Sequence, residues 1–92
     1  MKICIIDGAA ITDKNRLHDV LSESLQLPDW YGRNLDALYD CLTDMQEVTE
    51  VHILQVSALE SNLGRYAKAF LKMLGEVSED NTAVKLIIEE KM

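Results

Sequence analysis

The stretch LPDWYGRNLDALYDCLT, residues 27–43, combines a helix stop, a turn and a helix start. Pro28 cannot continue a preceding helix, and Gly32 suits a turn. Asn34 is a favourable N-cap, because its side-chain oxygen can accept a hydrogen bond from a free backbone N–H of the first helical turn. We therefore expect one helix to end just before this stretch and a second helix to run from Asn34 to about Thr43.

Apolar residues recur at helical spacing on both sides of this turn. Upstream, with Thr12 or Asp13 as the cap, the spacing predicts an amphipathic helix over residues 13–26. Downstream, three leucines at positions i, i+3 and i+7 place one face of the second helix against the core. The apolar residues are Leu17, Val20, Leu21 and Leu25 in the first helix, and Leu35, Leu38 and Leu42 in the second.

Three short segments rich in β-branched residues predict strands. The first is apolar almost throughout, which suits a strand that is buried on both faces. Helical segments separate the three strands, and helical crossovers return each strand in the same direction, so we expect parallel pairing. The segments are residues 1–6 (MKICII), 51–56 (VHILQV) and 83–88 (AVKLII).

Two further helices are expected between the second and third strands. Ser57 and Glu60 have the spacing of a capping box, which predicts the start of a short helix. Gly64 separates this helix from a fourth, and residues 78–82 (SEDNT) are expected to form a loop. The apolar face of the fourth helix would carry Tyr66, Ala67, Phe70, Leu71, Leu74 and Val77.

The chain length limits the number of domains. A chain of 92 residues can bury one hydrophobic core but not two. Its 48% hydrophobic and 27% charged residues are typical of a globular protein. The sequence therefore predicts a single α/β domain over residues 1–92, with a three-stranded parallel sheet flanked by about four helices.

The charge and the cysteines restrict the class of ligand. The net charge of −7 argues against a nucleic-acid ligand and favours a basic partner, although acidity also serves solubility. No apolar run matches a signal peptide or a membrane span, so we expect a cytoplasmic protein. Cys4 and Cys41 lack the spacing of a zinc or redox motif. We expect two buried free thiols, and neither a metal nor a cofactor.

Aromatic and acidic residues gather around the second helix. Asp36, Tyr39 and Asp40 lie at i, i+3 and i+4, so they share the face opposite the leucines. Trp30 and Tyr31 precede the cap, and aromatic anchors flanked by charges are typical of a protein-binding patch. A solvated helix face would also carry such acids, and we expect one of the two aromatics, Tyr31, to cover the core.

These acids are not accompanied by a catalytic motif. The sequence has neither a glycine-rich phosphate loop nor a recognisable nucleophile–base pair. Two carboxylates one turn apart on an exposed helix face have no cleft that would shift their pKa values. His18 and His52 are isolated in the sequence, and we expect both to be structural or solvent-facing. The sequence therefore favours a binding protein over an enzyme.

The opening stretch closely resembles the signature of the barstar family, intracellular inhibitors of the bacterial ribonuclease barnase. That signature reads approximately LP-x-x-YG-x-NLDALWD-CLT. The resemblance extends from Ile5 to Thr43 and resumes around Leu71, Glu76 and the last strand, whereas residues 44–65 align weakly. It implies a three-stranded parallel sheet with flanking helices, in agreement with the periodicity.

The resemblance also implies a mode of action. In the family, the second helix and the loop before it plug the nuclease active site. Asp40 would enter the subsite where cationic residues hold the RNA phosphate, because such a subsite attracts a rigidly held carboxylate. Glu76 would add an outlying ion pair. The implied partner-binding residues are Trp30, Gly32, Asn34, Asp36, Tyr39, Asp40 and Glu76.

The chain departs from the family pattern at three positions. Trp30 stands where the family commonly has Tyr, and Tyr39 stands where it has Trp. Arg33 replaces an acid, and its charge should repel an arginine-lined site. Two hypotheses follow. The protein is an inhibitor or immunity protein of a secreted, guanyl-preferring, barnase-type ribonuclease, monomeric when free. Alternatively, it is a barstar-fold binding module for a different basic protein, such as an unrelated toxin domain.

Overall fold

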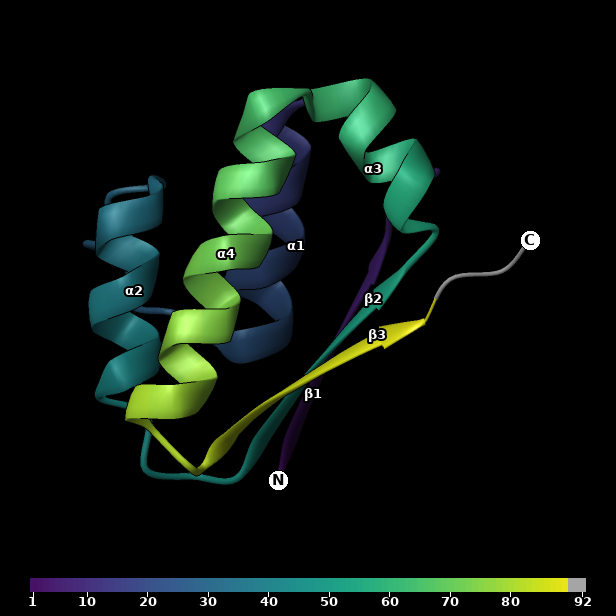
Figure 1. The fold of residues 1–92 in the computed structure, drawn as a ribbon. Coiled ribbons are helices and arrows are strands. Elements are labelled where there is room, and N and C mark those ends of the chain that lie inside the picture. Colours follow the sequence, from purple (N-terminus) through teal and green to yellow (C-terminus); the bar gives the residue numbers. More distant parts are fainter. Residues whose placement is uncertain (90–92) are drawn as a thin grey trace.

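The computed structural model describes residues 1–89, which form an α/β fold of three strands and four helices (Figure 1). This architecture confirms the predicted fold class. The strands are β1 (Lys2–Asp7), β2 (Thr49–Leu54) and β3 (Val84–Glu89). The helices are α1 (Lys14–Leu25), α2 (Leu35–Thr43), α3 (Val56–Leu63) and α4 (Arg65–Asp80).

The sheet has the strand order β1-β2-β3, and both pairings are parallel, as predicted. Helices α1 and α4 pack on the sheet, whereas α2 packs mainly against α4 and lies on its outer side (Figure 1). The second helix is thus held away from the sheet, and the face that it does not bury against the core remains open to solvent.

The expectation that the first strand is buried on both faces is wrong. Cys4 and Ile6 are fully buried, but Ile3 and Ile5 are 48% and 55% exposed. The helices that contact the strands cover one face, and the register places Cys4 beside the buried Val51 on that face. The strand therefore alternates between core and solvent, as in a sheet with one solvated face.

The predicted boundaries hold for the first two helices. Asp13 caps α1 by accepting a hydrogen bond from the backbone nitrogen of Arg16 at 2.8 Å. Asn34 caps α2 in the same way, through the backbone nitrogen of Ala37 at 2.8 Å. Helix α1 ends at Leu25, just before the expected stop.

Three elements in the second half differ from the prediction. Strand β2 spans Thr49–Leu54 instead of residues 51–56, so it begins inside the expected loop and ends before Gln55. Helix α3 already begins at Val56, after Gln55 in a left-handed conformation (φ 56°), so Ser57 lies inside the helix and is not its cap. Helix α4 continues to Asp80, because Ser78, Glu79 and Asp80 include no glycine or proline that would stop it. The longer α4 brings the end of this helix beside α2.

Candidate protein-binding site

The N-terminal end of α2 is fixed by its own cap. The side-chain oxygen of Asn34 accepts from Ala37, and its nitrogen donates to the carbonyl of Gly32 at 3.3 Å. A Cβ atom on Gly32 would lie 3.2 Å from the amide nitrogen of Asn34 and 3.4 Å from the Cβ of Ala37. Gly32 therefore leaves room for the cap, and both predicted site residues contribute to the shape of the loop.

The C-terminal end of α2 is tied to α4 by Asn81. The amide nitrogen of Asn81 lies 2.9, 3.2 and 2.8 Å from the carbonyl oxygens of Leu42, Thr43 and Met45. These carbonyls belong to the last turn of α2 and the residues just after it. The carbonyl of Leu42 also accepts from the backbone nitrogen of Met45 at 3.2 Å, whereas those of Thr43 and Met45 would otherwise need water as a donor. Asn81 was not identified from the sequence, because residues 78–82 were expected to be a loop.

The outward face of α2 carries its acids, as predicted. Leu38 and Leu42 are fully buried on one side of the helix, whereas Asp36 and Asp40 are exposed. Tyr39 lies between these two environments and is half-buried. Its hydroxyl donates a hydrogen bond to the carboxylate of Asp80 on α4.

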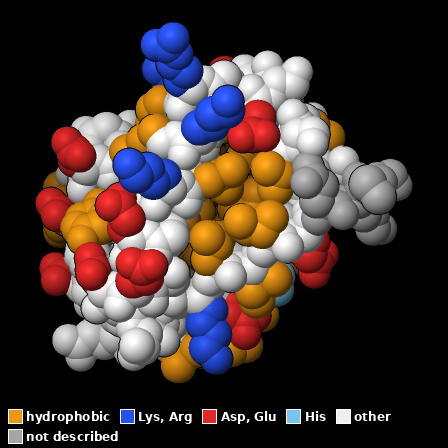
Figure 2. All heavy atoms as spheres, viewed as in Figure 1, with side chains coloured by type: hydrophobic (Ala, Val, Ile, Leu, Met, Phe, Trp, Pro, Cys, Tyr) orange, Lys and Arg blue, Asp and Glu red, His pale blue; other side chains and the backbone are white. Residues whose placement is uncertain are grey.

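Acids of α2 and α4 surround Tyr39. The hydrogen bond to Asp80 raises the pKa of Tyr39, and the negative charges of Asp80, Glu76 and Asp40 raise it further. Figure 2 shows the corresponding arrangement, in which acidic side chains encircle an apolar group over α2 and the adjacent part of α4. Glu76, 36 positions after Asp40 in the chain, thus contributes to the same acidic face.

The two aromatics of the loop have separate roles. The side chain of Trp30 is 80% exposed, whereas Tyr31 is buried in the core, as expected. The hydroxyl of Tyr31 lies 2.6 Å from Nδ1 of His18, and Nε2 of His18 lies 2.7 Å from the hydroxyl of Tyr66. These contacts anchor the loop to α1 and α4, so Trp30 projects from a fixed backbone.

His18 is a buried structural histidine, in agreement with one of the two expected roles. Burial lowers its pKa, and the positive charge of Arg33 lowers it further, while Asp19 raises it. A neutral imidazole can donate from one nitrogen and accept at the other, so it satisfies both tyrosine hydroxyls. Its partners come from positions 13 and 48 residues away, so the sequence alone did not reveal this network.

Arg33 is already paired within the chain. Its guanidinium donates to the carboxylate of Asp19 at 2.8 Å and to the carbonyl of Asn15 at 2.9 Å. Its backbone adopts a left-handed conformation (φ 55°). The charge that was expected to repel an arginine-lined site is therefore compensated by an acid of α1.

Other reactive groups lie outside this face. Cys4 is buried and Cys41 half-buried; both are free thiols, and burial raises the pKa of Cys4 to about 11. His52 contacts Glu50 in the same strand. Within residues 1–89, no three His, Cys, Asp or Glu side chains are grouped as metal ligands would be. The same residues contain no helix of the length and apolarity that a bilayer span requires.

Comparison with known proteins identifies the family. Residues 1–89 match the family model described as Barstar (barnase inhibitor). The chain belongs to the barstar family. A Bacillus subtilis (strain 168) protein named "Putative ribonuclease inhibitor YrdF" is 40% identical over 91 residues, which cover 97% of this chain and 100% of the relative.

In this barstar-family chain, the seven residues singled out from the sequence fall into three structural groups. Gly32 and Asn34 shape the cap of α2, and Trp30 projects from the loop before it. The remaining four lie on the outward faces of α2 and α4, where Asp80 joins them. These four are Asp36, Tyr39, Asp40 and Glu76.

Proposed function

We propose that the protein inhibits a basic ribonuclease of the barnase type by inserting the acidic face of α2 into its active site. Membership of the barstar family and the similarity to a protein named as a ribonuclease inhibitor support this proposal. The protein itself performs no catalysis. It acts in the cytoplasm, where it protects the RNA of the producing cell from a nuclease made for secretion.

One observation carries the proposal: Asp40 is an exposed carboxylate on a helix that is anchored at both ends. The Asn34 cap holds the start of α2, and Asn81 holds its end. The side chain of Asp40 forms no ion pair with residues 1–89, so its charge is available to a partner. A carboxylate on a fixed helix leaves only its own side chain to be ordered when it meets a cationic site, which lowers the entropy cost of binding.

The mechanism follows from the chemistry of the nuclease. An active site that binds RNA phosphate presents Arg, Lys or His side chains, and their charges stabilise phosphate oxygens. Asp40 takes the place of the phosphate, while Asp36 and Glu76 pair with cationic groups around it. Association of barnase with barstar is itself a standard example of electrostatic steering, and we expect the same fast, salt-sensitive pattern here.

The proposal is tested by titrating a barnase-type ribonuclease with the wild-type protein and with Asp40→Ala, at low and at physiological salt. We expect stoichiometric inhibition by the wild type, strong loss in the variant, and weakening by salt. Glu89→Gln is a matched control, because Glu89 is exposed at the end of β3, on the opposite side of the molecule from α2 (Figure 1). A folded wild-type protein that fails to inhibit at any ratio would refute the proposal.

A second candidate function is a barstar-fold module that neutralises a different basic protein, such as an unrelated toxin domain. The exchange of aromatics at Trp30 and Tyr39 favours it, because it changes the shape of the binding face. Arg33 no longer favours it, since Asp19 compensates its charge. Inhibition of a barnase-type enzyme in the titration would decide against this candidate.

A further inference from the structure

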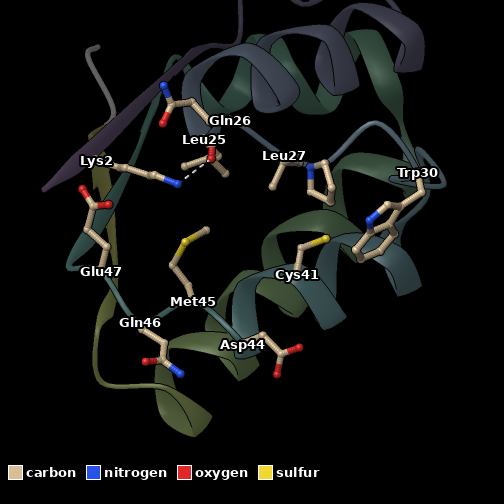
Figure 3. A pocket seen from close by; sticks show the side chains of 11 residues that line it. Lys2, Leu25, Gln26, Leu27, Trp30, Cys41, Asp44, Met45, Gln46 and Glu47 are labelled. Atoms are coloured by element: carbon tan, nitrogen blue, oxygen red, sulfur yellow. Dashed lines mark hydrogen bonds between the residues drawn. The ribbon is translucent and has the colours of Figure 1, made fainter.

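A cavity of about 370 Å³ opens beside Trp30, between the end of α1, the loop before α2 and the end of α2 (Figure 3). In Figure 3 the side chains of Leu27, Cys41 and Met45 point into it, and the indole of Trp30 stands at one edge. These walls are apolar, and the volume falls within the range of pockets that bind ligands or side chains.

The two sides of the cavity mouth differ in charge. On the side of β1, Lys2 donates to the carbonyl of Leu25 at 3.0 Å, and Glu47 pairs with the N-terminal amino group at 2.9 Å. Asp44 stands on the other side, and it forms no ion pair with residues 1–89. Lys2 has no ion pair with residues 1–89 either, so the mouth is positive on the side of β1 and negative on the side of α2, where Asp44 stands.

The cavity continues the acidic face of α2. Asp36, Asp40 and Asp44 follow one another at intervals of four residues, so they form a row along the helix that ends at the cavity mouth. The pKa of Cys41, inside the cavity, is raised by burial and then by the charges of Asp40 and Asp44. The row and the cavity thus adjoin each other along α2.

We infer that this cavity receives an apolar side chain from the rim of the ribonuclease, while a neighbouring Lys or Arg of the nuclease pairs with Asp44. The inference rests on the proposed function and extends its binding face. Two observations select this occupant. On the side of α2 the apolar walls end at the unpaired carboxylate of Asp44, which complements a basic protein, and Trp30 borders both the cavity and the acidic face. The residues that dominate the binding energy of protein interfaces are enriched in tryptophan and cluster in well-packed, desolvated pockets.

The arrangement also accounts for the exposure of Trp30. An indole that is 80% exposed leaves a large apolar surface in water. An apolar side chain seated in the cavity would cover one face of that ring, so the free energy of burial would contribute to binding instead of to folding.

The test measures the dissociation constant for a barnase-type ribonuclease with two variants of the cavity. Met45→Ala removes part of the wall and should raise the constant about tenfold. Asp44→Asn should raise it about two- to fivefold at low salt and less at high salt. The matched controls are Val48→Ala, an exposed apolar residue that does not line the cavity, and Glu89→Gln. Both controls should bind as the wild type does.

A second readout follows Trp30 directly. Trp30 is the single tryptophan of the chain, so incorporation of 5-fluorotryptophan gives one ¹⁹F resonance. Binding of the nuclease should shift that resonance, and Met45→Ala should reduce the shift. Because Met45 also packs against the core, the thermal unfolding of Met45→Ala is recorded first. If this variant does not fold, the exposed Asp44→Asn decides the inference alone.

The outcomes separate this inference from the proposed function. If Asp40→Ala abolishes inhibition while Met45→Ala and Asp44→Asn match their controls, the cavity is not part of the interface and the proposed function stands. If the wild type inhibits no barnase-type ribonuclease, the proposed function is wrong, and the occupant assigned to the cavity is wrong with it.

Discussion

Replacement of Asn81 by alanine should weaken both folding and binding, because this one amide joins the ends of α2 and α4. Its nitrogen donates to the carbonyls of Leu42 and Thr43 in the last turn of α2, and to that of Met45 just after it, at 2.8–3.2 Å. Its oxygen accepts from the backbone nitrogen of Ala83 at 3.0 Å. Asn81→Ala removes all of these bonds at once.

The expected loss of stability follows from the bonds that the amide can make. The amide uses both of its N–H groups and its oxygen in these bonds. Each neutral hydrogen bond contributes about 0.5–1.5 kcal/mol, so the free energy of unfolding should fall by about 2–3 kcal/mol. At about 4–8 °C per kcal/mol for a domain of this size, the melting temperature should fall by about 10–20 °C.

The matched control is Asn62→Ala. The amide nitrogen of Asn62 also donates to two backbone carbonyls, those of Gly8 and Ile11, at 3.2 and 3.1 Å. Asn62 belongs to α3, and neither of these two acceptors lies in α2. Urea unfolding gives the stability of both variants, and a ribonuclease titration gives their affinity.

Stability and affinity together decide whether Asn81 positions α2 for the proposed binding. Both variants should be less stable than the wild type, but only Asn81→Ala should bind more weakly at a temperature where both remain folded. If Asn81→Ala inhibits as well as Asn62→Ala does, the anchoring of α2 by Asn81 is irrelevant to binding and the reasoning is refuted.

Three further predictions concern stability and titration. Because burial lowers the pKa of His18, the native state binds fewer protons than the unfolded chain, so stability should be highest above pH about 6.5 and fall as the pH drops below it. Urea midpoints between pH 5 and 8 should show this slope, and His18→Gln should flatten it. Asp80→Asn should lower the pKa of Tyr39, measured by NMR, because the hydrogen bond to Asp80 and the charge of Asp80 raise that pKa. An unchanged pKa would mean that Asp80 does not contact Tyr39. Leu38→Ala should lower the free energy of unfolding in urea by about 2–5 kcal/mol, because Leu38 is fully buried. Asp36→Ala should weaken inhibition and leave the free energy of unfolding nearly unchanged. The reverse result would mean that the faces of α2 are misassigned.

The local signals in the sequence predicted the start and end of α1 and α2 well. Asp13 and Asn34 are strong caps whose effect depends on neighbours within three residues, so no tertiary information was needed. The burial of β1 could not be predicted in the same way. A run of isoleucines fits a strand that is covered on one face or on both, and the number of helical layers is a property of the whole fold.

The acidic residues of α2 were identified from helical periodicity and from the family signature, whereas their supports were missed. Asp80 and Asn81 were assigned to a loop, because the polar segment after Val77 resembles one. Arg33, in the loop before α2, is paired with Asp19, 14 residues away on α1, and no pattern in a single sequence indicates that contact. The residues of the exposed acidic face were thus easier to recognise than the residues that hold it in place.

The central claim is that Asp40 occupies the phosphate-binding subsite of the nuclease. The direct test is to measure binding of the protein to a barnase-type ribonuclease by calorimetry while guanosine 3′-monophosphate is added at constant ionic strength. With the nucleotide at 100 times its own dissociation constant, competition should weaken the apparent affinity about 100-fold. An affinity that does not change as the nucleotide fills the active site would show that the protein binds elsewhere, and it would contradict the claim.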